Sequence, residues 1–455
     1  MKAIIIGAGE VGYHTARVLT AERDHDVVLI DQSAAVCQRA QEQLDLIALP
    51  GSGTSPTLLK RAGIDNAGLL IAVTNSDEIN ILACAIAAQF RVRTKVARVS
   101  SPEYFEGEGG LHPEDLKIDL LINPEQLCAQ EFYRLLNTPE TREIVEFEDG
   151  KVRLVAFRVK APNPFQGKSM IQLGSEGLVS NLRFTGIKRV DGTTVVPKGN
   201  DVIYEGDEVF AIGSQEAIAV LLERSGVSLD EKLNRVVIAG AGRIGIYLAQ
   251  TLERDGVNVK LIEVDRERAE IASRTLKRTT VLHGDYLKPG FLEEAGVHEV
   301  DGFVSVTGDD ENDVMACVTA KQSGAARVLA LVQQPRYLPI LAAIPTLDSA
   351  VSRHLTAVGS ILGLVRRGHI VSVASLREID AEVIDIVAEA NSKIVRKDLI
   401  SLGRRFPRDA LVGAIVRREK VLVPTGKSVI QVGDRVIIFS LPHAIPEIED
   451  LFTAR

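Results

Sequence analysis

Two glycine-rich loops contain the residues whose types and spacing suggest chemistry. The first reads Gly7-Ala8-Gly9-Glu10-Val11-Gly12 after an apolar run, and the second reads Gly240-Ala241-Gly242-Arg243-Ile244-Gly245 in the same setting. A GxGxxG loop between a strand and a helix lets a pyrophosphate approach the backbone, and the helix N-terminus supplies donors for the phosphates. The loops therefore predict two dinucleotide-binding pockets.

An acidic residue follows each loop at the distance that such pockets require. Asp31 lies 19 residues after Gly12 (31 − 12), and Glu263 lies 18 residues after Gly245 (263 − 245). A carboxylate at the end of the second strand accepts hydrogen bonds from ribose hydroxyls and repels a 2′-phosphate, which favours NAD or an adenosine nucleotide over NADP. An ordinary structural turn is the alternative, but two loops in full context favour binding.

Polar residues also follow the third and fourth expected strands. Open parallel sheets bind ligands at the carboxyl ends of their strands. The candidate contacts there are Thr54 in Gly51-Ser52-Gly53-Thr54, Thr74 and Asn75, and in the second copy Asp285 in Gly284-Asp285-Tyr286 and Thr307 in Thr307-Gly308.

Arg98, on the fifth expected strand, distinguishes the two pockets. It could reach a phosphate, although an ordinary solvated arginine is equally compatible with the sequence. The corresponding residue of the second copy is Leu331, so that pocket lacks the charge. The two pockets are therefore expected to differ in ligand preference.

The loops belong to a chain whose sequence is internally duplicated. Gly240 follows Gly7 by 233 residues (240 − 7), and the same shift relates Asp77-Glu78 to Asp310-Glu311. A different repeat relates Gly206-Asp207 to Gly433-Asp434 with a shift of 227 (433 − 206). Such constant register indicates an A-B-A-B order.

Each A unit alternates apolar strands with amphipathic helices, which predicts an α/β fold with a Rossmann-like, doubly wound parallel sheet. In the first copy the expected strands are residues 2–6, 27–30, 46–49, 69–73 and 95–99, and Ser33, Ser55 and Asp77 mark helix starts. The B units contain β-branched runs and turn signals such as Asp191-Gly192. They are expected to be small α+β domains.

The predicted boundaries place the Rossmann-like domains at residues 1–123 and 232–348 and the small domains at 143–227 and 368–453. Residues 124–142 and 349–367 lie between them and have helical periodicity with apolar positions that need a neighbour. These segments are expected either to dimerise or to pack on their own A unit. Periodicity alone does not decide between the two.

Composition excludes several classes of protein. A chain of 455 residues is too long for one hydrophobic core, and its net charge of −8, without a dense Lys/Arg stripe, disfavours nucleic acid binding. No apolar run reaches the roughly 18 residues of a membrane span. The histidines show no metal-binding spacing, and four scattered cysteines argue against a zinc site or a disulfide framework: Cys37, Cys84, Cys128 and Cys317.

The sequence offers no convergent catalytic group. A dehydrogenase needs a general acid or base beside its cofactor. The available residues are scattered, and their surroundings do not recur between the copies: Lys160, Lys168, His369 and His443. Ligand sensing is therefore favoured over catalysis. An NAD-dependent oxidoreductase with duplicated cofactor domains and a nucleotide or redox sensor without a membrane partner stay open.

Nearly all 455 residues resemble the TrkA family of peripheral subunits of bacterial Trk potassium uptake systems. The resemblance rests on the motifs GAGEVG and GAGRIG, VTNSDEINILAC and VTGDDENDVMAC, and PKGNDVIYEGDEV and PTGKSVIQVGDRV. In that family, A is the RCK (or KTN) N-terminal domain and B is the RCK C-terminal domain.

The resemblance implies a non-enzymatic protein that binds NAD(H) and adenine nucleotides such as ATP and ADP. It implies a homo-oligomer, either a dimer or a tetrameric ring, that gates a membrane-embedded potassium-translocating partner from the cytoplasmic side. The nucleotide contacts that it implies are Gly7 to Gly12, Asp31, Thr74, Asn75 and Arg98, and Gly240 to Gly245, Glu263 and Thr307. This chain departs from the family pattern at Ser52, where the family has aspartate, and at Leu331, where it has a basic residue.

Overall fold

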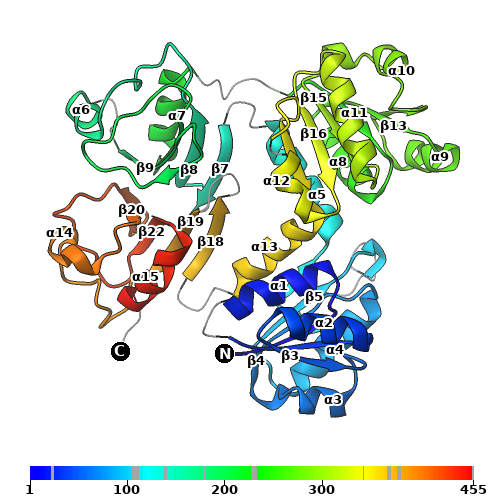
Figure 1. Ribbon diagram of the computed structural model, residues 1–455, viewed down its shortest axis with the longest axis horizontal. Coiled ribbons are helices and arrows are strands. Elements are labelled where there is room, and N and C mark those ends of the chain that lie inside the picture. The colour runs from blue at the N-terminus through cyan, green and yellow to red at the C-terminus, as the bar shows by residue number, and fades with distance from the viewer. Residues whose placement is uncertain are drawn as a thin grey trace. The chain divides into compact units, whose positions relative to one another are not determined.

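The computed structural model describes two compact units, here called the Rossmann unit and the α+β unit (Figure 1). The Rossmann unit comprises Met1–Asn137 and Leu233–Val365, and the α+β unit comprises Thr138–Lys232 and Arg366–Arg455. The residues described are 1–21, 25–104, 112–113, 115–137, 141–148, 150–177, 181–226, 233–341, 343–365, 370–376 and 381–452.

The first half of the Rossmann unit is a parallel six-stranded sheet in the order β3-β2-β1-β4-β5-β6. Its strands are β1 (Lys2–Ile6), β2 (Asp26–Asp31), β3 (Ile47–Pro50), β4 (Ala67–Ala72), β5 (Thr94–Arg98) and β6 (Leu120–Ile122). The doubly wound sheet confirms the predicted fold class. Strand β6 was not predicted, because three residues are too few to display a period.

Helices cover both faces of this sheet. Alternate residues of β1 enter opposite cores: Ala3 and Ile5 pack on the face covered by α1 (Glu10–Ala21) and α2 (Ala34–Gln43), whereas Ile4 and Ile6 pack on the face of α3 (Pro56–Arg61) and α4 (Asp77–Gln89). Continuous apolar strands are what burial on both faces requires.

The predicted helix starts are present as N-caps. The hydroxyls of Ser33 and Ser55 accept hydrogen bonds from the N–H groups of Val36 and Leu58, which lie in the first turns of α2 and α3. Ser76 caps α4 in the same way, one residue before Asp77. Each cap satisfies a donor that the first helical turn would otherwise leave free.

The second half repeats the arrangement in the order β14-β13-β12-β15-β16-β17. The strands are β12 (Arg235–Ala239), β13 (Asn258–Glu263), β14 (Thr280–His283), β15 (Gly302–Ser305), β16 (Val328–Val332) and β17 (Ser349–Ser352). The helices are α8 (Arg243–Arg254), α9 (Arg266–Thr275), α10 (Pro289–Glu294), α11 (Asp310–Gln322) and α12 (Leu338–Leu341). Residues 349–352, predicted as helical, form β17 because they pair in register with β16.

The crossover helices are exchanged between the two halves. Helix α5 (Pro124–Asn137) follows the first sheet but packs on α8 of the second half, and α13 (Arg353–Val365) follows the second sheet but packs on α1 of the first. Figure 1 shows the yellow α13 along the blue α1. Neither helix packs simply on its own A unit, so the packing alternative considered from periodicity is wrong.

Side chains of α5 complete the core of the second half. Phe132 and Leu136 are fully buried there, and Leu136 occupies the space beside Gly302, where a Cβ would lie 2.3 Å from its side chain. Arg327 donates hydrogen bonds to the carbonyls of Leu135 and Leu136, 3.1 and 2.5 Å away, at the end of the helix. A cation at a helix C-terminus is electrostatically favourable.

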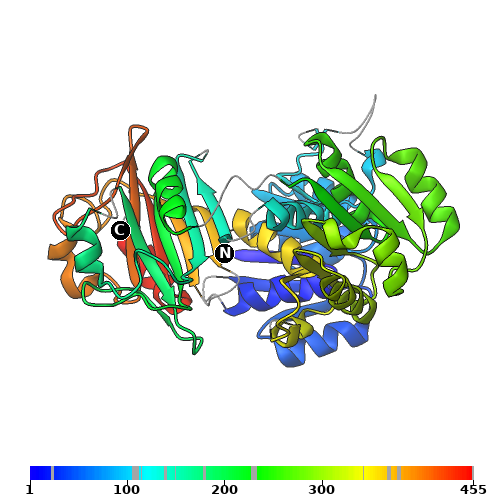
Figure 2. The ribbon, with the colours of Figure 1, turned by 90° about the horizontal axis from the view of Figure 1, so that it is seen from above.

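The α+β unit contains two antiparallel five-stranded sheets (Figure 2). The first is β7 (Thr141–Phe147), β8 (Val152–Arg158), β9 (Leu182–Lys188), β10 (Thr194–Val195) and β11 (Glu208–Ser214), with α6 (Met170–Ser175) and α7 (Gln215–Arg224). The second is β18 (Ile370–Leu376), β19 (Ala381–Val387), β20 (Ala410–Arg417), β21 (Lys420–Leu422) and β22 (Arg435–Ser440), with α14 (Leu399–Leu402) and α15 (Ile445–Phe452).

The two sheets of this unit share one core through a reciprocal contact. A Cβ on Gly186 would lie 2.6 Å from the ring of Phe439, and a Cβ on Gly413 would lie 2.7 Å from Ile212. Gly413 is the repeat equivalent of Gly186 (413 − 186 = 227), and Phe439 is that of Ile212 (439 − 212 = 227). Each sheet thus has a glycine that leaves room for a large side chain of the other.

The repeated Gly-Asp pairs of the B units have a structural role. Asp207 accepts the N–H of Tyr204 at 2.8 Å and pairs with Arg189 at 2.5 Å. Asp434 accepts the N–H of Gln431 at 2.8 Å and pairs with Arg417. A buried carboxylate with such partners holds the turn before the next strand.

The four cysteines are buried as free thiols. Among the helices that the structure describes, none is long and apolar enough to cross a membrane.

Candidate nucleotide-binding pockets

The first glycine loop lies between β1 and α1, as predicted. Gly7 has a φ of 98° and donates its N–H to the carbonyl of Ile30 at 2.8 Å. A Cβ on Gly12 would lie 1.8 Å from the oxygen of Gly7, so only glycine allows the helix to pack this close. Around Gly9, no atom lies within 4 Å of a Cβ position. The space above Gly9 is therefore open to a ligand that must approach the backbone.

The second loop has the same construction. Gly240 has a φ of 107° and bonds to the carbonyl of Ile262 at 2.8 Å. A Cβ on Gly245 would lie 2.0 Å from the oxygen of Gly240. Gly242 is the N-cap of α8, and the nearest atom to its Cβ position is 4.0 Å away. Both loops thus fit a pyrophosphate at a helix N-terminus.

Each predicted acidic residue faces its loop. Asp31 accepts the N–H of Ala8 at 2.8 Å and that of Ser33 at 2.9 Å. Glu263 accepts the N–H of Ala241 at 2.7 Å and that of Asp265 at 3.0 Å. Each carboxylate oxygen has two lone-pair sites and receives one of these bonds, which leaves acceptor capacity for ribose hydroxyls.

The residues after the third strands interact mainly within their own loops. The hydroxyls of Ser52 and Thr54 are 2.9 Å apart, and Asp285 accepts the N–H of Leu287 at 3.0 Å. Tyr286 is 7% exposed, and burial raises the pKa of its hydroxyl. None of these hydrogen bonds joins Thr54 or Asp285 to a glycine loop.

Asn80, which sequence reasoning missed, fixes Thr74 at the end of β4. Its side-chain oxygen accepts the N–H and the hydroxyl of Thr74 at 2.9 and 2.8 Å, and its amide donates to the carbonyls of Thr74 and Arg98 at 3.0 and 2.9 Å. Asn80 is fully buried in α4. A polar residue among the apolar positions of that helix was the available signal.

The second copy has Asp313 at the same place (313 − 80 = 233). It is fully buried and accepts hydrogen bonds from the Ser305 hydroxyl at 2.6 Å and from the N–H and hydroxyl of Thr307 at 2.8 and 2.9 Å. Gly308 donates to its other oxygen at 3.3 Å. The four donors converge on the two oxygens of one side chain.

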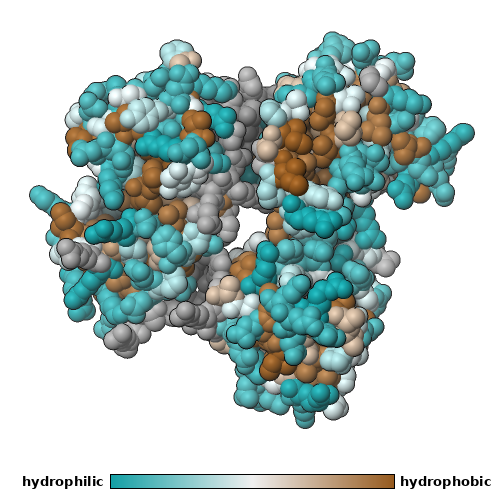
Figure 3. Space-filling view, viewed as in Figure 1, coloured by the Kyte–Doolittle hydropathy of each residue, from teal (hydrophilic) through white to brown (hydrophobic). Residues whose placement is uncertain are grey.

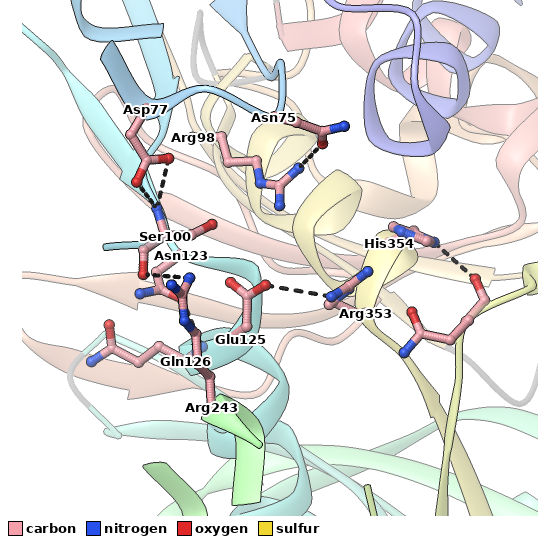
Figure 4. Close-up of polar contacts among 11 residues, drawn as sticks. Asn75, Asp77, Arg98, Ser100, Asn123, Glu125, Gln126, Arg243, Arg353 and His354 are labelled. Atoms are coloured by element: carbon pink, nitrogen blue, oxygen red, sulfur yellow. Dashed lines mark hydrogen bonds and ion pairs between the residues drawn. The ribbon is translucent and has the colours of Figure 1, made fainter. Parts of the chain in front are cut away.

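Arg98, at the end of β5, and Asn75, three residues after β4, are brought together (Figure 4). Arg98 donates to the side-chain oxygen of Asn75 at 3.2 Å. Burial lowers the pKa of Arg98, and charges that lie close enough to act on it come from both halves of the unit: Glu125, Arg353, Asp77 and Arg243. Glu125 itself is 6% exposed and pairs with Arg353 at 3.5 Å.

The side chain of Arg243 reaches toward the first half, although its backbone belongs to the second loop. Its guanidinium donates to the carbonyl of Ser100 at 3.4 Å, just beyond β5. Glu10, the repeat equivalent of Arg243, lies 3.3 Å from His14. Burial above all lowers the pKa of His354, and Glu10 acts in the opposite direction. His354 bonds to the carbonyl of Gln333, the repeat equivalent of Ser100 (333 − 100 = 233).

Two of the scattered basic residues of the small domains lie beside acidic residues of their own unit. Lys168 pairs with Glu176, and the exposed His443 lies 3.1 Å from Asp409. His369 lies outside the described residues. Within the described part of the chain, no group of three or more His, Cys, Asp or Glu side chains could hold a metal ion.

The chain matches two family models, each of them twice. The TrkA-N domain matches residues 3–124 and 236–353, and the TrkA-C domain matches residues 154–226 and 383–453. Similar curated proteins include a Trk system potassium uptake protein TrkA of Halomonas elongata, 36% identical over 99% of this chain and 98% of that protein. Another is a TrkA homolog of Methanosarcina mazei, 32% identical over 99% of this chain and 100% of that protein.

Solved structures with the same fold include the GsuK channel, with a TM-score of 0.62 and 19% identity over 100% of this chain and 79% of that chain. The GsuK channel bound to NAD has a TM-score of 0.60 and 20% identity over the same shares. The isolated GsuK RCK domain also has a TM-score of 0.60, at 19% identity over 100% of this chain and 95% of that chain.

Proposed function

Because the chain belongs to the TrkA family, we propose that it is the nucleotide-binding regulatory subunit of a potassium uptake system. The observation that carries the proposal is the duplicated pocket. In each half a carboxylate holds a glycine loop whose middle glycine is open to a ligand. Relatives that this chain matches over 98% of their own length are named as potassium uptake proteins.

NAD(H) is the first ligand that we propose, with ATP and ADP as further ligands. The carboxylates of Asp31 and Glu263 suit the two ribose hydroxyls of NAD and disfavour the 2′-phosphate of NADP. The GsuK channel, which shares the fold, has been solved with NAD bound. In this chain the ligand's pyrophosphate would be held by the loop N–H groups, and Arg98 would add a positive charge to the first pocket.

The partner that we propose is a membrane-embedded potassium-translocating protein, which holds this chain at the cytoplasmic face of the membrane. Direct binding to anionic lipid is disfavoured by the net charge of −8. A nucleotide moves a gate only by the difference in its affinity for two conformations. A shift from 1:99 to 99:1 needs roughly a 10⁴-fold preference, about 5.5 kcal/mol, which the two pockets can share.

Reconstituted transport tests this proposal. The partner that co-purifies from membranes is placed in potassium-loaded vesicles, and uptake is measured with this chain and NADH, NAD⁺, ATP or ADP. We expect at least one nucleotide to change the uptake rate severalfold without being consumed. An uptake rate that no nucleotide changes would refute the regulatory function. Steady oxidation of NADH with a substrate would support the oxidoreductase alternative.

We further propose that the chain assembles with copies of itself. The fourth helix of each Rossmann half exposes an apolar side chain at the same repeat position, Leu82 at 50% and Met315 at 56%. Ile340 on α12 is 63% exposed, and Figure 3 shows apolar surface over that helix. Apolar positions repeated in this way suit a symmetric contact between identical chains.

The combined Leu82→Asp and Met315→Asp variant is expected to have at most about half the wild-type mass at micromolar concentration, because buried unpaired carboxylates oppose association. Light scattering after size exclusion measures this. Ile271→Asp is the matched control, since Ile271 is also 56% exposed but lies on α9. A wild-type monomer, or an unchanged mass in the double variant, would count against self-assembly through these helices.

A further inference from the structure

One buried position differs in charge between the two pockets. Asn80 of the first half is replaced by Asp313 in the second, and Ala72 beside it by Ser305 (305 − 72 = 233). The two changes belong together, because the Ser305 hydroxyl donates to Asp313 at 2.6 Å. In the first half, the neutral Asn80 both accepts from Thr74 and donates to carbonyls.

Asp313 lies directly beneath the ligand-binding edge of its sheet. One oxygen accepts the N–H of Thr307 at 2.8 Å and the other accepts the N–H of Gly308 at 3.3 Å. Burial raises the pKa of this carboxyl, and the hydrogen bonds act against that shift. Because both oxygens accept a backbone N–H, the network stabilises the ionised form. The second pocket therefore has a fixed negative charge that the first lacks.

The charges around the two pockets also make the second pocket more negative than the first. The first pocket has Arg98, with Arg243 reaching toward it from the other half. The second has Leu331 in place of Arg98, and the repeat equivalent of Arg243 is Glu10, whose charge acts on His354. Two independent features thus make the second pocket less favourable to anions.

We propose that Asp313, with its partner Ser305, determines nucleotide specificity by phosphate charge. The first pocket favours a nucleoside triphosphate over a diphosphate more strongly than the second does, and both accept a dinucleotide such as NADH, which has two phosphates. The inference rests on the proposed nucleotide-binding function and assigns a ligand preference to each pocket. Asp313 acts through Thr307 and Gly308, so it is a positioning residue that makes no contact with the ligand.

The test compares ATP with ADP at each pocket by calorimetry. Gly9→Ala leaves the second pocket to be measured, and Gly242→Ala leaves the first. We expect the ratio of ATP affinity to ADP affinity to be at least about tenfold higher in the first pocket, since the two ligands differ by one charged phosphate. This comparison needs no change at Asp313.

An exchange of the buried residues then assigns the effect. The Ser305→Ala and Asp313→Asn double variant introduces the residue types of the first half, and Ala72→Ser with Asn80→Asp is its mirror control. We expect the first to raise the ATP-to-ADP ratio of the second pocket about tenfold and the mirror variant to lower that of the first pocket. A merely structural role would change both affinities by the same factor.

The possible outcomes distinguish a failure of the charge-based specificity from a failure of the proposed nucleotide binding. If no nucleotide binds the wild-type chain, the proposed function fails. If both pockets bind with equal ATP-to-ADP ratios, the charge-based specificity fails while nucleotide binding stands. If the ATP-to-ADP ratios of the two pockets differ but the Ser305→Ala and Asp313→Asn variant leaves them unchanged, Asp313 does not determine the specificity.

Discussion

Gly9→Ala is expected to lower the nucleotide affinity of the first pocket roughly a hundredfold, about 2.8 kcal/mol, without a loss of stability. The reason is steric. A Cβ on Gly9 meets nothing within 4 Å in the protein, so the added methyl group fills only the space through which a pyrophosphate reaches the backbone. Gly242→Ala is expected to do the same in the second pocket. Calorimetry measures the affinity, and thermal unfolding measures the stability.

Gly12→Ala serves as the contrasting variant. Its Cβ would lie 1.8 Å from the oxygen of Gly7, so the helix must shift, and both stability and binding are expected to fall. If Gly9→Ala binds nucleotide as tightly as the wild type, the ligand does not approach the loop, and the glycines are only a structural turn.

Phe132→Ala is expected to lower the free energy of unfolding of the Rossmann unit by about 3–5 kcal/mol, the usual effect of a large cavity. Phe132 lies in α5, which follows the first sheet, yet its fully buried ring belongs to the core of the second half. The loss of protection in hydrogen exchange should therefore appear in α8, and α1 should be spared.

Gln130→Ala is the matched control, because Gln130 is an exposed residue of the same helix. It should change stability by less than about 0.5 kcal/mol. Protection lost in α1 instead of α8 after Phe132→Ala would mean that α5 packs on the half to which it belongs in sequence.

Much of the fold follows from local patterns. Ser33 and Ser55 cap helices where the sequence predicts them, since the cap hydrogen bond involves only neighbouring residues. The glycine loops and the acidic residues at the strand ends are equally local features. Their repetition at a constant shift makes the duplicated parallel sheet predictable from one sequence.

The exchange of α5 and α13 was not predictable in the same way. An amphipathic helix shows which of its faces is apolar, but not which core that face enters. Phe132 and Leu136 would look the same in the sequence whichever half they packed on. The roles of Asn80 and Asp313 were also hidden, because their partners at the strand ends are brought to them only by the tertiary fold.

The number of nucleotides bound per chain tests the central claim most directly. Equilibrium titration of the purified chain with NADH, followed by calorimetry while NADH absorbance is monitored, is expected to give two sites in the wild type. It should give one site in either Gly9→Ala or Gly242→Ala and none in the double variant, with no NADH consumed. No binding to the wild type, or two sites that survive both substitutions, would contradict the account.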